Sequence, residues 1–274
     1  MEYTKIIWMY WHQGFEQAPE IVSRCVEQWI VMHPDWEIKL LDQNSVNQYA
    51  GPLPIAENVL NKLNLAHRSD LIRTQLLIKY GGVWADPTTF CTTSLNSWIP
   101  EYLSGGLFMF YKPGRDRIIS NWFIAAEKDN MILKKMFKEL CEYWQNNKFK
   151  NHGSKVWYEA FCNRLLNRSL PLTKLWFTFL FKKVLRIYPY MVYHYKFYQI
   201  ISSTKKYESI WNSVPKFSAH IPHKLLHLGL LKPLTSEGKD WIDQKKSPIF
   251  KLTWKLGVQE FPKGSLLKYI FENE

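Results

Sequence analysis

Two carboxylates and a guanidinium interrupt a segment of this chain that otherwise has the pattern of a protein core. Asp70, Arg73 and Asp86 lie in HRSDLIRTQLLIKYGGVWADPTTF, residues 67–90. Charges beside buried strands are costly unless they are paired with one another or used to bind a ligand. If they are only paired, Asp70 and Arg73 form a salt bridge and Asp86 begins a turn before Pro87. If they are used together, two acids and one base form a polar site.

The spacing of these charges predicts that they meet. From Asp70 a helix advances about 15 Å, the double glycine at 81–82 turns the chain, and residues 83–86 return about 10 to 13 Å as a strand. The second acid therefore arrives close to the first. Arg73 lies on the same helix face as Asp70 because the two are three residues apart.

The elements around this segment predict an α/β fold. Residues 3–11 and 36–42 have strand character, and an apolar stripe predicts a helix over 19–34 between them, which makes a βαβ unit with parallel strands. Such sheets place ligands beyond the carboxyl ends of their strands. Further strands are expected at 83–86 and 107–111, and helices at 65–80, 118–127, 131–146 and 154–168. Periodicity is poor from 170 to about 200, and no linker or repeat divides the chain.

The segment SDLIRTQLLIKYGGVWADPTTF resembles the DXD region of GT-A glycosyltransferases, in the form shared by capsular polysaccharide synthesis proteins. It is similar, more distantly, to the yeast initiating mannosyltransferase and the glucosylating clostridial toxins. The stretches KIIWMYWHQG, PGRDRIISNWFIAAEKDN, PHKLLHLGLLKPLT and PIFKLTWKLG extend the capsular resemblance over most of the chain. The resemblance implies a Rossmann-like GT-A fold: a mainly parallel central sheet flanked by helices, with a helical, aromatic C-terminal embellishment. It implies one domain over 1–274, with a nucleotide-sugar-binding half (1–130) and an acceptor- and membrane-facing half (131–274).

The activity implied by the resemblance is transfer of a sugar from a nucleotide-sugar donor, a UDP-sugar, to a capsular or other bacterial surface polysaccharide, with retention of the anomeric configuration. The acceptor would be carried on a polyprenyl diphosphate lipid. Two other classes stay open from the residues alone: a noncatalytic scaffold or glycan binder, and a basic polyanion-binding protein. A nucleic-acid partner is not expected, because the chain has no recognisable RNA or DNA motif and such a role leaves Asp70 and Asp86 without a purpose.

The resemblance assigns roles around the donor sugar. Asp70 would accept hydrogen bonds from sugar hydroxyls, Arg73 would lie over the sugar or diphosphate, and Ser69 precedes them as in the toxins. Trp11 matches the aromatic residue on which uracil stacks, with core packing as the alternative. Asn121 matches a polar position on the acceptor side, with the start of a surface helix as the alternative. The expected catalytic residues are thus Asp70, Arg73, Asp86 and Asn121.

The diphosphate requires positive charge at the leaving oxygens, either a divalent cation or fixed cationic groups. Asp86 matches the first acid of the motif, which contacts ribose and Mn²⁺ or Mg²⁺. Thr88 occupies the position of the second acid, and a hydroxyl is a weaker ligand for these ions than a carboxylate. A late histidine, His223 or His227, would supplement the metal or diphosphate. Lys251 and Lys255 would neutralise the diphosphate and compensate for Thr88.

A zinc site is an alternative use of the late histidines His220, His223 and His227. Pro222 interrupts the cluster, and neither a cysteine nor a carboxylate lies nearby in the sequence to complete the site. The four cysteines, Cys25, Cys91, Cys141 and Cys162, have no C-x-x-C spacing, which favours reduced structural thiols.

The net charge of +12 is concentrated in one block. Between Glu159 and Glu208 the chain has no acidic residue and nine Lys or Arg, and residues 171–200 are also rich in aromatic side chains. Interfacial segments combine these residue types, so we expect contact with an anionic membrane surface; a solvated helix surface is the commoner meaning of such a charge run. The first residues have no signal-peptide pattern and no stretch is long enough to span a bilayer. The expected location is the cytoplasm, at the inner face of the cell membrane.

Overall fold

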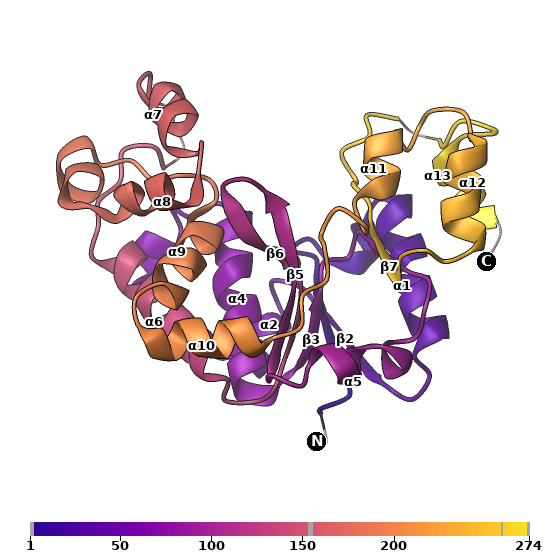
Figure 1. Cartoon of the computed structure of the whole chain (residues 1–274), viewed down its shortest axis with the longest axis horizontal. Coiled ribbons are helices and arrows are strands. Elements are labelled where there is room, and N and C mark those ends of the chain that lie inside the picture. Colours follow the sequence, from indigo (N-terminus) through magenta and orange to yellow (C-terminus); the bar gives the residue numbers. More distant parts are fainter. Residues whose placement is uncertain (1–2, 153–155, 259, 273–274) are drawn as a thin grey trace.

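A five-stranded sheet forms the centre of the molecule. The computed structural model describes residues 3–152, 156–258 and 260–272. The strand order is β2 (Glu37–Leu41), β1 (Ile6–Tyr10), β3 (Gly82–Ala85), β6 (Arg117–Ala126) and β5 (Leu107–Gly114) (Figure 1). β1 runs parallel to both β2 and β3, as the βαβ pattern predicts, whereas β6 is antiparallel to both β3 and β5. The sheet is therefore mixed, and the expectation of a mainly parallel sheet is wrong for its β6–β5 half.

The antiparallel half follows from a tight hairpin that the sequence pattern did not reveal. The segment predicted as a helix over 118–127 is strand β6, and only two residues, Arg115 and Asp116, separate it from β5. β6 has buried side chains on both faces, so its apolar run is nearly continuous and carries no period that separates a strand from a helix. Its three isoleucines and its aromatic pair favour a strand.

Helices cover both faces of the sheet. α4 (Leu65–Tyr80), α6 (Met131–Gln145) and α9 (Val192–Ile201) pack on one face, and α1 (Glu20–Met32) packs on the other. Alternate residues of β1 enter the two cores: Trp8 faces α4, whereas Ile7 and Met9 face α1. The predicted helices at 19–34, 65–80 and 131–146 are confirmed. The helix predicted over 154–168 is confirmed only as α7 (Glu159–Leu166), and residues 154–155 lie outside the described chain.

The poorly periodic stretch after residue 170 consists of short helical turns. These are α8 (Leu170–Thr173), a 3₁₀ turn η3 (Lys174–Phe177) and a π-helical turn η4 (Leu180–Leu185), followed by α9 and α10 (Lys205–Ser213). No single 3.6-residue period runs through them, which explains the weak pattern. The remaining short elements of the first half are η1 (Phe15–Gln17), α2 (Val46–Ala50), α3 (Glu57–Leu60), η2 (Leu95–Ser97) and α5 (Ile99–Tyr102).

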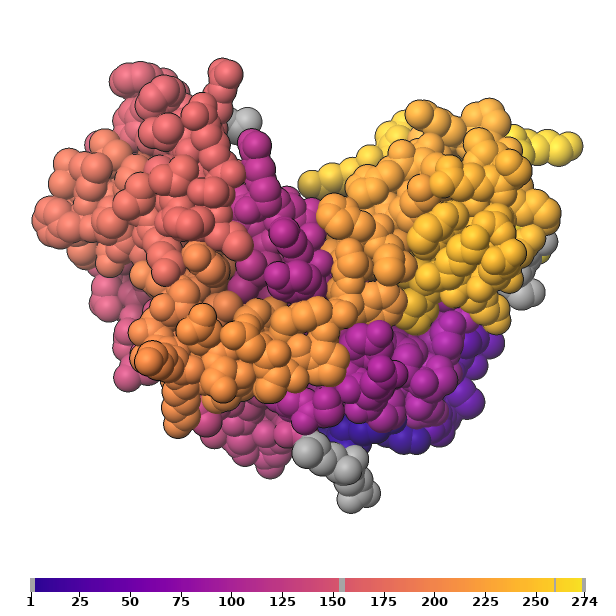
Figure 2. All heavy atoms as spheres, viewed as in Figure 1, coloured from indigo at the N-terminus to yellow at the C-terminus, as the bar shows by residue number. Residues whose placement is uncertain are grey.

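Two lobes extend from the sheet, and a hollow lies between them. The helical lobe is formed by α6 to α10; the C-terminal lobe is formed by α11 (Lys224–Leu228), α12 (Ser236–Asp243), β7 (Ile249–Lys251) and α13 (Leu266–Glu272). β7 pairs antiparallel with β4 (Thr89–Cys91) and so fixes the C-terminal lobe to the chain just after β3. Figure 2 shows the hollow, with the β5–β6 hairpin between the lobes. Among the described residues no helix has the length and apolar character needed to cross a membrane.

The turn from α4 into β3 depends on two glycines. Gly81 ends α4 with φ +72° and donates its N–H to the Leu77 carbonyl, and Gly82 begins β3 with φ +87°. A Cβ on Gly82 would lie 2.5 Å from the carbonyl oxygen of Ile6 in the neighbouring strand. Residue 82 must therefore be glycine both for its backbone conformation and for the close approach of β1.

Gly82→Ala should lower the free energy of unfolding by more than the roughly 1 to 3 kcal/mol that a strained left-handed residue costs, because the methyl group also collides with β1. Gly51→Ala is the matched control, because Gly51 has φ +76° but no atom within 4 Å of the added Cβ. Urea unfolding of both variants measures the difference. Equal losses of stability would show that the contact with Ile6 is unimportant.

Candidate active site

Arg73 of α4 lies at the centre of the predicted charge cluster. Its guanidinium is 3.6 Å from Asp70 Oδ1 and 3.6 Å from Asp86 Oδ1, and it lies over the Trp84 ring at 4.8 Å. It also donates to the carbonyl of Asn121 and, at 3.0 Å, to Ser69 Oγ. The residue is only 5% exposed, so these contacts replace the water that a buried cation loses.

Asp70 is held by groups from α4 and β6. Its Oδ1 accepts a hydrogen bond of 2.7 Å from Asn121 Nδ2 on β6, and its Oδ2 lies 3.7 Å from His67 Nδ1 one turn earlier on α4. Thr74 donates to the Asp70 carbonyl at 2.6 Å. Asn121 therefore lies within a strand and not at the start of a surface helix, and its amide is fixed to one of the two acids.

Asp86 immediately follows β3, at the carboxyl end where the sheet predicts a ligand. Its Oδ1 accepts a hydrogen bond of 2.9 Å from Trp84 Nε1, and its backbone N–H donates to the Trp122 carbonyl at 2.8 Å. The Lys251 ammonium lies 3.4 Å from Asp86 Oδ2 and donates to Thr88 Oγ1 at 2.6 Å. The expectation that the helix and strand bring both acids together is confirmed, with Arg73 between them.

A cavity of about 490 Å³ opens over this cluster, between the two lobes (Figure 2). Its volume is in the range of small-molecule sites. The sheet and α4 supply its floor, the helical lobe one wall and the C-terminal lobe the other. The lining residues are Ala66, His67, Asp70, Arg73, Asp86, Pro113, Arg117, Ser120, Asn121, Trp122, Tyr190, Met191, His194, His220, His223, His227 and Lys251.

Several residues that line the cavity carry buried polar atoms without a hydrogen-bond partner. Within the described chain these atoms are both ring nitrogens of His67, Ser120 Oγ, Trp122 Nε1 and His194 Nδ1. Buried polar atoms in native proteins are almost always paired, and an exception calls for an explanation such as a ligand. Near the cavity the protein therefore leaves several polar atoms without a partner.

The three late histidines line the cavity together. The His223 and His227 ring centroids are 6.3 Å apart, and those of His220 and His227 are 6.5 Å apart. The Nδ1–H of His223 donates to the Ala219 carbonyl at 2.6 Å, which leaves Nε2 as an acceptor. Burial lowers the pKa of His223 to about 4, so its ring is neutral at pH 7.

A divalent cation fits Asp86 and Thr88 poorly in this arrangement. Lys251 Nζ is hydrogen-bonded to Thr88 Oγ1 and paired with Asp86 Oδ2, so one ammonium engages both oxygens. Across the described residues, no group of three or more His, Cys, Asp or Glu side chains could hold a metal ion. Metal binding by Asp86, Thr88 and His223 stays a prediction from the resemblance.

Four of the residues named from the sequence do not line the cavity. Trp11 packs edge-on against Trp254, with ring centroids 5.7 Å apart, and the Lys255 ammonium lies over the ring of the same Trp254. Ser69 and Thr88 contact residues that line the cavity: Ser69 accepts a hydrogen bond from Arg73, and Thr88 accepts one from Lys251. Uracil stacking on Trp11 and diphosphate binding by Lys255 stay predictions.

The structure adds lining residues that the sequence did not single out. Arg117 enters from β6, and Tyr190 and His194 enter from the helical lobe. His67 was identifiable, because it lies three residues before Asp70 on the same helix face. Nothing in the local sequence identifies Arg117, Tyr190 or His194 as lining residues, because their position at the cavity depends on how the helical lobe packs against β6.

Comparison with known proteins gives the following similarities. Residues 1–152, more than half of the chain, match the family described as "Capsular polysaccharide synthesis protein". The chain is 28% identical over 159 residues to O-glycosyltransferase braB of Annulohypoxylon truncatum, an alignment that covers 51% of this chain and 38% of braB. It is 30% identical over 149 residues to glycosyltransferase afumC of Aspergillus fumigatus, covering 48% of this chain and 38% of afumC. The match thus spans about two fifths of these relatives.

Among solved structures, the PaToxG glycosyltransferase aligns over 89% of this chain and 85% of its own, with a TM-score of 0.44 and 15% sequence identity.

His194 should make stability depend on pH. Burial lowers its pKa from 6.5 to about 3, with further lowering by Arg117 and Arg73. Between pH 6.5 and about 3 the unfolded chain binds a proton that the folded chain does not, so the free energy of unfolding falls by at most about 1.4 kcal/mol per pH unit as the pH is lowered.

Urea unfolding of the wild type and of His194→Gln across this range measures the effect. The stability difference between the two proteins should be constant above pH 7, where it reports packing alone, and should shift in favour of the variant below pH 6. A difference that does not change with pH would contradict the low pKa.

Proposed function

This chain belongs to the capsular polysaccharide synthesis family, and we propose that it is a glycosyltransferase that uses a nucleotide-sugar donor. The observation that carries the proposal is the cavity at the carboxyl end of β3, where Arg73 joins Asp70 to Asp86. The partial matches to braB and afumC, both named as glycosyltransferases, support the same reaction class.

The donor we propose is a UDP-sugar bound across this cavity. The second oxygen of Asp70 is available to accept from sugar hydroxyls, because Asn121 binds the first. Asp86 at the strand end is in a position to accept from ribose. The diphosphate would meet the cationic side chains that line the cavity, Arg73, Arg117 and Lys251, which favour developing negative charge on the leaving group.

Retention of the anomeric configuration is part of this proposal. The carboxylates that line the cavity, within the described chain, are Asp70 and Asp86, and Arg73 lies 3.6 Å from each. An inverting transfer needs a general base free to take a proton from the acceptor hydroxyl. The pairing of both acids with one guanidinium supports a retaining reaction.

The acceptor we propose is a capsular or related surface glycan carried on a polyprenyl diphosphate lipid. The open side of the cavity lies between the two lobes, so a glycan chain has access there. An enzyme that modifies a lipid-linked acceptor has to approach the inner face of the membrane.

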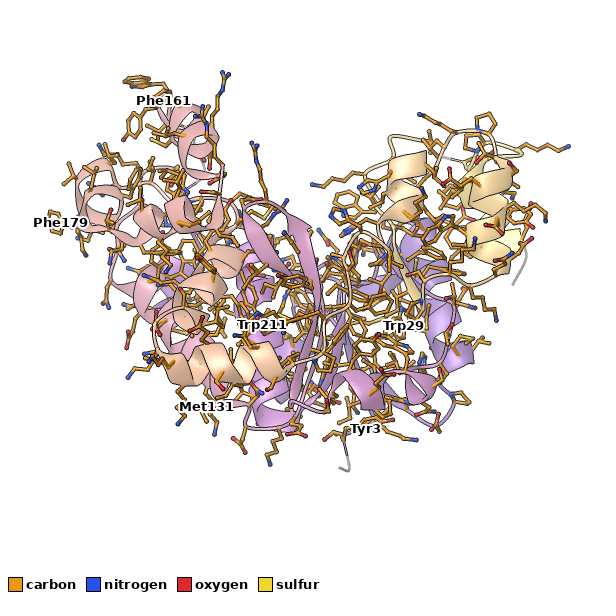
Figure 3. The ribbon with its side chains drawn as sticks, viewed as in Figure 1. Tyr3, Trp29, Met131, Phe161, Phe179 and Trp211 are labelled. Carbon is orange, nitrogen blue, oxygen red and sulfur yellow. The ribbon has the colours of Figure 1, made fainter. Side chains whose placement is uncertain are left out.

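The outer edge of the helical lobe supports contact with an anionic bilayer. Trp157, Phe161 and Phe179 are 89%, 68% and 73% exposed, and Figure 3 shows Phe161 and Phe179 at the outer edge of this lobe. Arg164, Arg168 and Lys183 are exposed near them in the sequence, in the stretch between Glu159 and Glu208 without acidic residues. Apolar side chains flanked by cations match the chemistry of an anionic interface.

The structure changes which residues we expect to contact the membrane. Most aromatic side chains of residues 171–200 are buried in the core, among them Trp176, Tyr193, Tyr195 and Phe197. They cannot reach a membrane in the folded protein. The exposed apolar residues that we propose for membrane contact come mainly from 157–184.

Donor turnover tests the activity. Wild type should slowly hydrolyse one sugar nucleotide in a screen of UDP-, GDP- and CMP-sugars, and Asp86→Asn should lower that rate about a hundredfold, because a charged contact to donor and Arg73 is lost. Asp129→Asn is the control, since Asp129 is 59% exposed and pairs with Lys134 on the surface. A chain that hydrolyses none of the donors, and transfers none, is a scaffold or polyanion binder instead.

Vesicle flotation tests the membrane contact. Wild type should float with phosphatidylglycerol-containing vesicles and much less with pure phosphatidylcholine, and the triple variant Trp157→Ser, Phe161→Ser, Phe179→Ser should lose most of this binding. Val31→Ser is the control, because Val31 is 71% exposed but lies on α1. Equal flotation with both vesicles, or a triple variant that floats like wild type, would refute the proposed surface.

A further inference from the structure

We propose that Lys251 takes the place of the divalent cation at the motif and binds the donor diphosphate directly, so that donor binding does not require a metal ion. This inference rests on the proposed function. Thr88 places a neutral hydroxyl at the second acidic position of the motif, so a ligand that a divalent cation would use is missing there.

The position of Lys251 is fixed by backbone pairing. β7 pairs with β4 so that Lys251 lies opposite Thr89, and the N–H of Leu252 donates to the Thr88 carbonyl at 2.8 Å. On the other side, the N–H of Lys251 donates to the Pro222 carbonyl at 2.9 Å. The side chain therefore starts from a rigid strand beside the motif, although 165 residues separate it from Asp86.

The ammonium makes the contacts that a cation at the motif would make. Lys251 Nζ donates to Thr88 Oγ1 at 2.6 Å and lies 3.4 Å from Asp86 Oδ2, and its side chain is 16% exposed. An ammonium has three donors, and the described partners use two of them. Because Lys251 also lines the cavity, the third can point to a ligand oxygen there.

The chemistry at residue 88 agrees with this assignment. With two carboxylates the motif would carry two negative charges, which a divalent ion balances; with Asp86 and Thr88 it carries one, which a single ammonium balances. The Asp86 carboxylate, 3.4 Å away, favours the positive charge of Lys251, and a diphosphate would favour it further. During transfer the lysine would hold its proton and stabilise the leaving oxygens electrostatically.

Binding of UDP, measured by calorimetry in EDTA and in excess MnCl₂, tests the inference without relying on turnover. Wild type should bind UDP with dissociation constants within about twofold of each other in the two buffers, and Lys251→Met should weaken binding at least about tenfold in EDTA. Lys251→Arg retains the positive charge and should recover part of the affinity, which separates charge from packing. Lys138→Met is the control, because Lys138 is 72% exposed, pairs with Glu142 on α6 and does not line the cavity.

A double variant gives the converse result. Thr88→Asp with Lys251→Met restores the second acid and removes the ammonium, so it should bind UDP only when Mn²⁺ is present. Wild-type binding that is lost in EDTA and restored by Mn²⁺ would overturn the role of Lys251 but leave the glycosyltransferase proposal intact. Failure to bind UDP in either buffer, together with no turnover of any donor, would overturn both.

Discussion

The buried Arg73 guanidinium is the interaction on which the site and the surrounding fold depend. It brings together Asp70 of α4, Asp86 at the end of β3 and the backbone of Asn121 in β6, above the Trp84 ring. Removing a cation from water costs several kcal/mol unless anions and carbonyls surround it. Arg73 would therefore destabilise the fold without its two acids, and the acids would do so without Arg73. The same charges that a ligand would meet hold α4, β3 and β6 in one arrangement.

The C-terminal lobe completes this cluster from a distant part of the chain. β7 adds an antiparallel partner to β4, directly after the motif, and brings Lys251 to Asp86 and Thr88. The same lobe contributes His220, His223 and His227 to one wall of the cavity, while the helical lobe contributes Tyr190 and His194 to the other. The cavity thus exists only where the two lobes approach each other over the sheet, and it stays open on one side.

Local geometry explains why the central prediction succeeded and why others failed. The rise of a helix and of a strand is fixed per residue, so the distance from Asp70 to Gly81 and back to Asp86 follows from counting. β6 was predicted as a helix because burial on both faces removes the period that distinguishes the two structures. The aromatic residues of 171–200 suggested a membrane surface, but most of them are buried in the core, since composition alone does not specify which side of a short helix is covered.

The sequence by itself determined the charge cluster, the glycine turn that folds it together, the βαβ start of the sheet and the concentration of positive charge after Glu159. These are properties of residue type and short spacing, which the backbone converts into structure without help from distant segments. Only the tertiary structure decided that the sheet is mixed, that Trp11 packs on Trp254 outside the cavity, and that Lys251 and not Lys255 reaches the motif. Those outcomes depend on which segments, distant in the sequence, pack against each other, and this is set by the packing energy of the whole chain.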